Sequence, residues 1–345
     1  MGQSLSAIGA AFDAMFANWT IKFLKDIDLV AAELASRSPR PTVLITGPTS
    51  GIGRQTATRL FLNGHANLVL ACRNVAKGEA LRGELVAAWP GADAPTVEVQ
   101  ELDVSSLASV RSFAKSWSSS GRPLDVLVCN AGMDDFGEAP RAETAEGFEV
   151  HLATNYLGHA LLTRLLVPNL LAGGAASRHV PRVVMVTSLL HFLGRIDKGD
   201  VNLLKGYDHR RAYTQSKLFQ VLFAAELAHR TGGRIFAVSV HPGLVATDIA
   251  RGASAEQRKK LASFERMAIP AAQGCRSSLV AVASEKLVRK AGEDAQKGPV
   301  YLHWTGGRRK ASPAARDRTL QTWAWNWTAE AVGLPRELDG GANAV

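Results

Sequence analysis

A glycine-rich turn between an apolar segment and a helical pattern constrains the fold of this chain more than any other feature. The turn, Thr-Gly-Pro-Thr-Ser-Gly-Ile-Gly, occupies residues 46–53 and follows the β-branched and leucine-rich residues 42–45. Such an apolar run is typical of a strand that is buried on both faces of a parallel sheet. After the turn, apolar side chains recur at helical spacing. A turn that leads from a strand into a helix in this way requires residues without a Cβ, so the sequence predicts an α/β fold.

The same turn is predicted to bind the pyrophosphate of a dinucleotide. The first turn of the following helix offers free backbone N–H groups and a partial positive charge, both of which favour an anion. The glycine spacing is G-x-x-x-G-x-G rather than the common G-x-G-x-x-G, and a tight turn that binds nothing is the alternative for this stretch alone. The residues expected to contact the cofactor here are Gly47, Thr49, Ser50, Gly51, Ile52 and Gly53.

A second predicted strand, residues 66–72, ends directly before Arg73 and Asn74, which are also expected to contact the cofactor. In dinucleotide sites an acidic side chain after this strand binds the ribose of NAD, whereas an arginine accommodates the 2′-phosphate of NADP. No Asp or Glu occurs between residues 67 and 76, so NADP(H) is the expected cofactor. The alternative is that Arg73 is an ordinary solvated charge at a strand end.

Further predicted strands alternate with helices, which indicates right-handed crossovers and a doubly wound Rossmann-type parallel sheet. With residues 96–101, 124–129, 182–187, 234–240 and 299–303 as strands, the sheet is expected to hold about seven. Ligands of such sheets bind at the carboxyl ends of the strands. The cofactor contacts expected at these ends are Asp103, Val104, Asn130, Ala131, Gly132, Pro242, Gly243 and Thr247. Asp103 can bind the adenine amino group or cap the helix that follows it.

Tyr213 and Lys217 share one face of a predicted helix because they stand at positions i and i+4. The tyrosine has a reference pKa of about 10, and the adjacent ammonium together with an oxidised nicotinamide is expected to lower that pKa. Ser188, at the end of a predicted strand, can then bind the substrate oxygen while Tyr213 transfers a proton. Asn155, in a predicted helix over residues 148–166, must find hydrogen-bond partners if it is buried. The alternative is a surface tyrosine and lysine with no shared role.

The chain is expected to hold one large domain over residues 41–310, because no second glycine loop and no repeat is visible. Within it, the charged segment over about residues 249–270 is expected to form a substrate lid. Residues 311–345 are expected to form a helical tail whose tryptophans pack against the core or an interface. The three cysteines are widely spaced, so neither a disulfide framework nor a metal site is expected.

Residues 1–40 are expected to form an amphipathic helical extension and a linker. The start of the chain matches the acylation pattern with Gly2 as the lipidation site, and charged side chains interrupt the apolar face, so the segment is expected to lie on a membrane rather than span it. The alternative is that this helix packs on the core or on a second subunit. Without an evident secretory signal, a cytoplasmic location is expected, with membrane association on the cytosolic face as an option. The net charge of +9 suits a phosphorylated cofactor or acidic lipids, and the basic clusters lack the interleaved aromatic residues of a nucleic-acid site.

These motifs together resemble the short-chain dehydrogenase/reductase family over most of the chain. The T-G-x-x-x-G-I-G turn of the family matches residues 46–53, and its N-N-A-G motif matches residues 129–132, where Cys129 replaces the first asparagine. The Asn-Ser-Tyr-Lys tetrad of the family falls on Asn155, Ser188, Tyr213 and Lys217. The sequence is most similar to the branch of retinol dehydrogenases and the WW-domain oxidoreductase.

The resemblance implies NADP(H)-linked interconversion of an alcohol and a carbonyl on a lipophilic substrate such as a retinoid, a steroid or a polyprenol, often at a membrane. It also implies that Asn155 anchors a helix bend and a water that relays protons to Lys217, and that a homodimer can form through the helices bearing Asn155 and Tyr213. Cys129 is expected to loosen the strand packing. Two other functions stay open, namely a catalytically silent NADPH-binding regulatory or scaffold protein at a membrane, and a specialised reductase such as one that acts on a tetrapyrrole.

Overall fold

The structure of the chain is a computed structural model that describes residues 39–134, 140–246, 268–293 and 298–338. The predicted N-terminal extension with its lipidation site Gly2 lies outside the described residues. So do Thr247 and most of the predicted lid.

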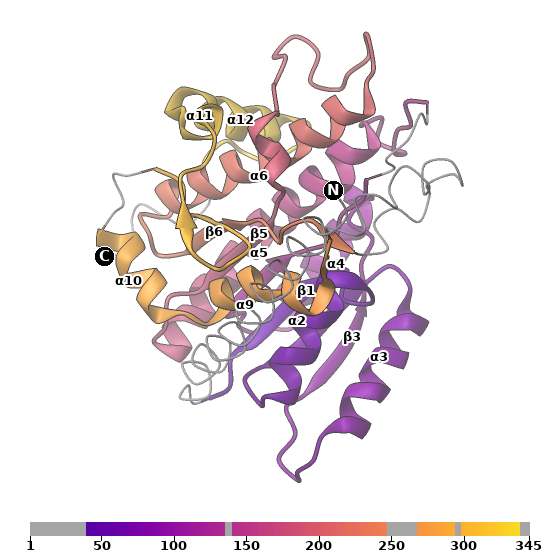
Figure 1. Cartoon of the computed structure of the whole chain (residues 1–345), viewed down its shortest axis with the longest axis vertical. Helices are drawn as coiled ribbons and strands as arrows, with labels where there is room; N and C mark the ends of the chain where they lie inside the picture. Colours follow the sequence, from indigo (N-terminus) through magenta and orange to yellow (C-terminus); the bar gives the residue numbers. More distant parts are fainter. Residues whose placement is uncertain (1–38, 135–139, 247–267, 294–297, 339–345) are drawn as a thin grey trace, which may run out of the picture.

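A sheet of eight strands forms the middle layer of the molecule (Figure 1), in the order β10-β9-β6-β5-β4-β1-β2-β3. The strands are β1 Thr42–Thr46, β2 Asn67–Cys72, β3 Val97–Glu101, β4 Val126–Cys129, β5 Arg182–Val186, β6 Phe236–Val240, β9 Tyr301–Leu302 and β10 Arg308–Arg309. From β3 to β9 neighbouring strands run parallel, and β10 runs antiparallel to β9. The predicted doubly wound α/β fold is therefore confirmed, with an additional antiparallel edge strand that is too short and too charged to show an apolar pattern.

Helices cover both faces of the sheet and make three layers. The helices are α2 Gly51–Leu62, α3 Val75–Ala88, α4 Leu107–Ser119, α5 Gly158–Ser177, α6 His209–Arg230, α8 Ala271–Gly274, α9 Arg276–Ala283, α10 Glu285–Glu293, α11 Pro313–Arg316 and α12 Arg318–Ala331. On β1, Leu44 packs into the core beneath α4, α5 and α6, whereas Val43 and Ile45 pack into the core beneath α2, α3 and α9. This division follows from the strand geometry, because successive side chains point to opposite faces.

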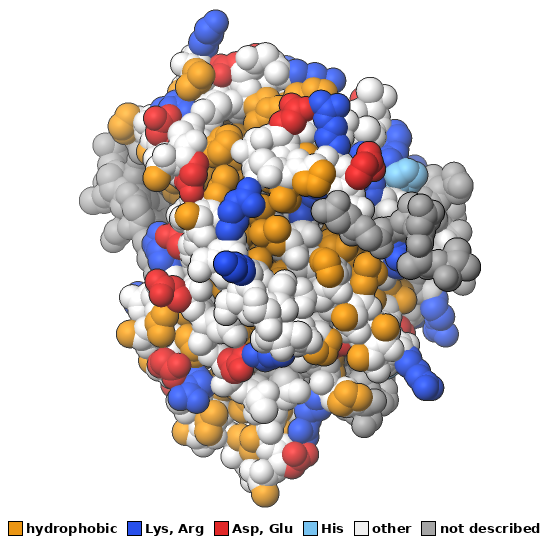
Figure 2. All heavy atoms as spheres, turned by 180° about the vertical axis from the view of Figure 1, so that it is seen from behind, with side chains coloured by type: hydrophobic (Ala, Val, Ile, Leu, Met, Phe, Trp, Pro, Cys, Tyr) orange, Lys and Arg blue, Asp and Glu red, His pale blue; other side chains and the backbone are white. Residues whose placement is uncertain are grey.

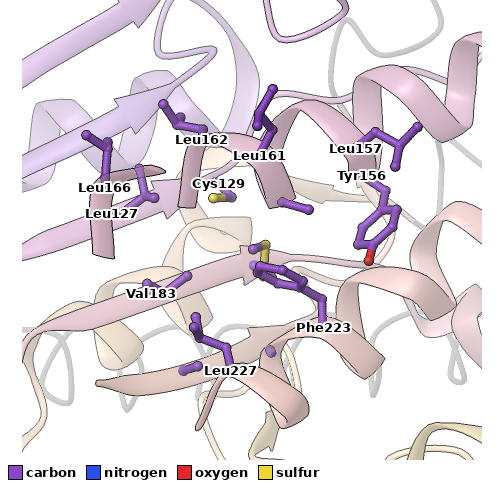
Figure 3. Packing of buried hydrophobic residues seen from close by; sticks show 14 of the residues in the cluster. Leu127, Cys129, Tyr156, Leu157, Leu161, Leu162, Leu166, Val183, Phe223 and Leu227 are labelled. Carbon is purple, nitrogen blue, oxygen red and sulfur yellow. The ribbon is translucent and has the colours of Figure 1, made fainter. Parts of the chain in front are cut away.

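The core beneath α5 and α6 fixes the two helices that carry the predicted catalytic residues. Figure 3 shows Leu127 and Val183 from neighbouring strands facing Leu162 of α5 and Phe223 of α6. All four side chains are buried, and each contributes about 1.5–3 kcal/mol of hydrophobic free energy. Among the described residues one helical stretch, Leu152–Ser177, is long and apolar enough to cross a membrane, but it lies in this core, where burial accounts for its composition.

The helix predicted over residues 148–166 differs from the observed one. It begins with a π-helical turn, Leu152–Leu157, and α5 then continues to Ser177. The π-turn has a tertiary cause, because the Nε2 atom of Gln220 on α6 donates to the carbonyl oxygen of Asn155 at 2.9 Å. A side chain that inserts into the hydrogen-bond ladder in this way bends a helix.

The chain then returns to pack its C-terminal helix α12 against α6 (Figure 1). The ring of Trp325 stacks on that of Phe223 with centroids 5.2 Å apart, and the hydroxyl of Tyr156 bonds to that of Thr328. In the described part of the predicted tail, tryptophan therefore packs in the core, as the sequence indicates.

The carboxyl end of β1 lies at the point where the strand order reverses. The strand β1 pairs with β2 on one side and with β4 on the other. In open α/β sheets this is where ligands bind, outside the carboxyl ends of the strands. The glycine turn follows β1 at this position.

Candidate active site

The glycines of the turn after β1 are required by its backbone. Gly47 and Gly51 have φ angles of +62° and +52°, a conformation that residues with a Cβ rarely adopt. A Cβ on Gly53 would lie 2.3 Å from the carbonyl oxygen of Gly47 and 2.4 Å from the Nδ2 atom of Asn130. The turn is thus too tight for side chains at these positions.

The start of α2 is suited to bind an anion. Its N-cap residue Ser50 has an extended backbone, and in this described helix the serine side chain makes no capping hydrogen bond and the first turn carries no acidic residue. The side chains of Thr49, Ser50 and Ile52 are half-buried beside it. Free N–H groups, a spare hydroxyl and a positive dipole end together fit a pyrophosphate.

The carboxyl ends of β1 and β4 are locked together by hydrogen bonds. The Thr46 hydroxyl oxygen accepts the backbone N–H groups of Asn130 and Ala131 at 2.9 and 3.0 Å. The Asn130 side chain in turn donates to the carbonyl oxygens of Thr46 and Gly47 at 3.0 and 3.1 Å. Two of the predicted cofactor residues after β4, Asn130 and Ala131, therefore stand directly beside the glycine turn.

The expectation that Cys129 loosens this strand is not met. Its side chain is fully buried in the core, and its sulfur lies 3.7 Å from the hydroxyl oxygen of Thr163. Burial raises the pKa of the thiol to about 12, so it is a neutral, well-packed group. Of these two neighbouring residues, it is Asn130 whose side chain bonds to the turn.

The residues after β2 and β3 meet at the far end of the predicted cofactor site. Arg73 is largely exposed, and its Nη1 atom lies 3.8 Å from the Oδ2 atom of Asp103. The Oδ1 atom of Asp103 accepts from the backbone and hydroxyl of Ser105, while Ser106 caps α4. Asp103 therefore does not cap the helix. Asn74 caps α3 by accepting from the N–H of Lys77 at 2.9 Å.

Gly158, the first residue of α5, presses this helix against the loop after β3. A Cβ on Gly158 would lie 1.9 Å from the carbonyl oxygen of Val104, which is itself buried. The predicted cofactor residue Val104 is thereby held in place by α5.

Tyr213, Ser188 and Lys217 come together at the carboxyl end of β5. The hydroxyls of Tyr213 and Ser188 are hydrogen-bonded, and the Nζ atom of Lys217 lies 5.5 Å from the centre of the Tyr213 ring. Lys217 also donates to the carbonyl oxygen of Val186 at 3.2 Å, which ties α6 to the strand end. A Cβ on Gly132 would lie 3.6 Å from the Lys217 Nζ atom, so the residues after β4 border the same site.

Asn155 joins the π-turn to both neighbouring elements. Its Oδ1 atom accepts from the N–H of Met133 at 2.8 Å, and its Nδ2 atom donates to the carbonyl oxygen of Met133 and the hydroxyl of Ser216, each at 3.0 Å. The buried amide thus has the partners that the sequence analysis required. Asn155 lies in the π-helical turn Leu152–Leu157, and its implied role in anchoring a bend and a water relay stays a prediction.

The pKa of Tyr213 in the protein without cofactor is governed by burial. Burial is the largest influence and raises the pKa of Tyr213, the carboxylate of Asp134 raises it further, and the hydrogen bond from Ser188 lowers it. Burial lowers the pKa of Lys217 to about 8, against the attraction of Asp134. In the protein alone Tyr213 is therefore a neutral phenol, ready to donate a proton. The sequence analysis did not predict that Asp134, which is buried, influences this site. Its position two residues after the predicted cofactor contact Gly132 could have indicated that it lies nearby.

The turn after β6 supplies the remaining predicted contacts. Pro242 is buried and Gly243 has a φ of +95°, with its N–H donating to the Nδ1 atom of His241 at 3.1 Å. Burial lowers the pKa of His241 to about 4, so this imidazole is neutral and accepts that bond. Within the described residues no group of His, Cys, Asp or Glu side chains is arranged to hold a metal ion.

Comparison with known proteins agrees with this arrangement. A family model described as short chain dehydrogenase matches residues 41–258. Dehydrogenase/reductase SDR family member FEY from Arabidopsis thaliana is 34% identical over 324 residues, which cover 89% of this chain and 84% of that protein. Retinol dehydrogenase 13 from Mus musculus is 35% identical over 308 residues, with coverage of 86% and 85%.

Solved structures give the same result. The crystal structure of a protein from Mycobacterium Paratuberculosis has 31% sequence identity and a TM-score of 0.67, and covers 89% of this chain and 98% of that chain. The NADPH-bound carbonyl reductase from chicken fatty liver, at 20% identity and a TM-score of 0.55, shares the fold over 79% of this chain and 99% of its own. The chain therefore belongs to the short-chain dehydrogenase family, whose members are oxidoreductases that use nicotinamide dinucleotides.

Proposed function

We propose that this chain is an NADP(H)-dependent oxidoreductase that interconverts an alcohol and a carbonyl on a lipophilic substrate. One observation carries the proposal. The phenol of Tyr213 is bonded to Ser188 and has Lys217 beside its ring at the carboxyl end of β5, on the same edge of the sheet as the glycine turn after β1.

The residues at this strand end can perform acid–base chemistry on a carbonyl. Tyr213, as a neutral phenol, donates a proton to the carbonyl oxygen during reduction and recovers it through its phenolate during oxidation. Ser188 accepts the N–H of Leu190 at 3.2 Å, and its hydroxyl proton is directed to the tyrosine or the substrate oxygen. The Lys217 ammonium stabilises the phenolate after proton transfer. The bound nicotinamide supplies or accepts the hydride.

The preference for NADP(H) is supported by the charge at the end of β2. Arg73 is exposed there and is the first residue after the strand, in a segment whose sequence contains no acidic side chain. A guanidinium can bind a 2′-phosphate through charge-assisted hydrogen bonds.

A lipophilic substrate is supported by the surface beside Ser188. The short 3₁₀ helix Leu189–Phe192 and the next residue present exposed apolar side chains, namely Leu189, Leu190, Phe192 and Leu193. Exposed apolar groups that gather beside a reactive site mark a binding surface. The names of the retinol dehydrogenase relatives agree with a lipophilic alcohol. On the face in Figure 2, Lys and Arg side chains are mixed with Asp and Glu side chains.

The activity is tested by a screen of NADPH oxidation against retinoid, steroid and polyprenol carbonyls, with NADH as the comparison. Tyr213→Phe should abolish turnover and leave NADPH binding within about twofold, because it removes the proton donor and keeps the ring. Tyr156→Phe is the matched control, since Tyr156 is a buried tyrosine whose hydroxyl bonds to Thr328 of α12 rather than to a group at the strand ends. Unchanged turnover of Tyr213→Phe would refute the mechanism, and NADPH binding without turnover of any compound would favour the silent regulatory protein.

Peripheral membrane contact through residues 1–40 is a separate part of the proposal, supported by the acylation pattern at Gly2. Metabolic labelling with a myristate analogue should mark the natural chain and not Gly2→Ala. A chain that takes up no label would refute acylation.

A further inference from the structure

His159, the second residue of α5, connects the two halves of the site through a fully buried side chain. Its Nδ1 atom lies 3.1 Å from the carbonyl oxygen of Asn155, and its Nε2 atom lies 2.9 Å from the hydroxyl oxygen of Thr46. Thr46 ends the strand that leads into the glycine turn, and Asn155 forms the helix bend.

The protonation state of this imidazole follows from its partners. A carbonyl oxygen can only accept, so the Nδ1 atom of His159 carries the hydrogen and donates it to Asn155. The hydroxyl oxygen of Thr46 already accepts two backbone N–H groups, from Asn130 and Ala131, which fill its lone pairs. Its proton is therefore directed to the Nε2 atom of His159 at 2.9 Å, which lies nearer than its other acceptor, the carbonyl oxygen of Val128 at 3.4 Å. His159 is the neutral Nδ1–H tautomer, and burial, which lowers its pKa to about 4, favours the same form.

The two bonds complete a continuous buried path across the site. On the cofactor side, Thr46 joins His159 to Asn130, whose side chain holds the carbonyl oxygen of Gly47. On the catalytic side, Asn155 joins His159 to Gln220 and Ser216 of α6. The helix α6 carries Tyr213 and Lys217, so the path reaches from the glycine turn to the reacting groups.

We propose that His159 is a positioning residue that holds the dinucleotide-binding turn and the Asn155 bend in one fixed relation. This inference rests on the proposed function, because it assigns one end of the path to cofactor binding and the other end to proton transfer.

The two bonds can be removed one at a time. In His159→Asn the amide nitrogen takes the place of Nδ1 and keeps the bond to Asn155, but the side chain is too short to reach Thr46. In His159→Gln the amide oxygen reaches the position of Nε2 and accepts from Thr46, but the donor to Asn155 is lost. Each variant therefore tests one end of the path.

The two variants should each change a different quantity. His159→Asn should raise the Kd for NADPH by about three- to tenfold and leave the single-turnover rate within about twofold, since one buried hydrogen bond is lost on the cofactor side. His159→Gln should slow the single turnover by about three- to tenfold and leave the Kd nearly unchanged. Thr163→Val, which removes another buried hydroxyl from α5, is the matched control and should move neither quantity.

Two measurements keep this test independent of any substrate. Hydrogen exchange at the N–H of Met133, which is bonded to the Asn155 side chain, should accelerate in His159→Gln and not in His159→Asn. The ¹⁵N resonances of His159 in the natural chain should show a protonated Nδ1 and an unprotonated Nε2. If both variants lower binding and rate equally, or if the tautomer is reversed, the inference is wrong. If no carbonyl is turned over but binding and exchange separate as stated, the proposed function fails and the link through His159 stands.

Discussion

The choice of NADP(H) over NAD(H) can be tested at Arg73 with Arg73→Ala. The side chain is 78% exposed and its contact in the protein is the 3.8 Å approach to Asp103. An exposed pair of this kind contributes about 0.2–1 kcal/mol, so the free energy of unfolding should change little. The perturbation therefore acts on the cofactor rather than on the fold.

The expected loss of affinity follows from the bond that the arginine would make. A hydrogen bond to a charged group contributes about 1.5–3 kcal/mol, which corresponds to about a 10- to 150-fold increase in the Kd for NADPH. The carboxylate of Asp103 remains 30% exposed beside the vacated position and would repel a 2′-phosphate. The increase in the Kd for NADPH should therefore lie toward the upper end of this range. NADH carries no 2′-phosphate, so its Kd should change less than about twofold.

The assay is a titration of NADPH and NADH, followed by calorimetry or protein fluorescence, on the natural chain and on two variants. Lys77→Ala removes a neighbouring exposed positive charge from α3 and is the control for general electrostatics. It should weaken NADPH by less than about threefold at physiological salt, because exposed charges are screened. Equal losses for both nucleotides in Arg73→Ala, or equal effects of the two variants on NADPH, would refute the reasoning.

Two further predictions follow from the site. Gly53→Ala should weaken binding of either nucleotide and lower the free energy of unfolding by about 1–3 kcal/mol, because the new Cβ would lie 2.3 Å from the Gly47 carbonyl oxygen. Gly83→Ala is the control: its Cβ would have no neighbour within 4 Å, so it should stabilise α3 by up to about 1 kcal/mol. Thermal unfolding and nucleotide titration check both variants. Since burial lowers the pKa of Lys217 to about 8, its ammonium is present below this pH and lost above it, so carbonyl reduction should slow as the pH rises through about 8. Lys217→Arg should move that decline to higher pH, and an unmoved pH profile would show that another group titrates.

The local features of the site could be predicted from the sequence because each depends on a few neighbouring residues. The positive φ angles at positions 47 and 51 require glycine, and glycines at this spacing between a strand and a helix are enough to indicate the turn. Tyr213 and Lys217 share a face by helix geometry alone. Their convergence with Ser188 follows once the strands are known to be parallel, because parallel strands end on one edge of the sheet.

The features that were missed depend on contacts between distant segments. The π-turn at Asn155 exists because Gln220, from another helix, bonds to its carbonyl oxygen. The continuation of α5 to Ser177 passes through Pro168, which local rules would treat as a helix end. Leu170 beyond this proline is fully buried, and tertiary packing of this kind overrides local preference. Likewise the raised pKa of Tyr213 results from burial, which sequence spacing does not reveal.

The C-terminal helix explains how the catalytic face of α6 is held in place. Glu226 is buried on α6 and forms ion pairs with Arg230 and with Arg318 of α12. A buried carboxylate requires such partners, so α12 is needed to satisfy the charge that α6 places inside the protein. Trp325 packs on the same side of α6, which leaves Tyr213 and Lys217 to address the strand ends. Because α12 already lies against this helix, a homodimer that pairs through α6 would have to include α12 in its interface or displace it.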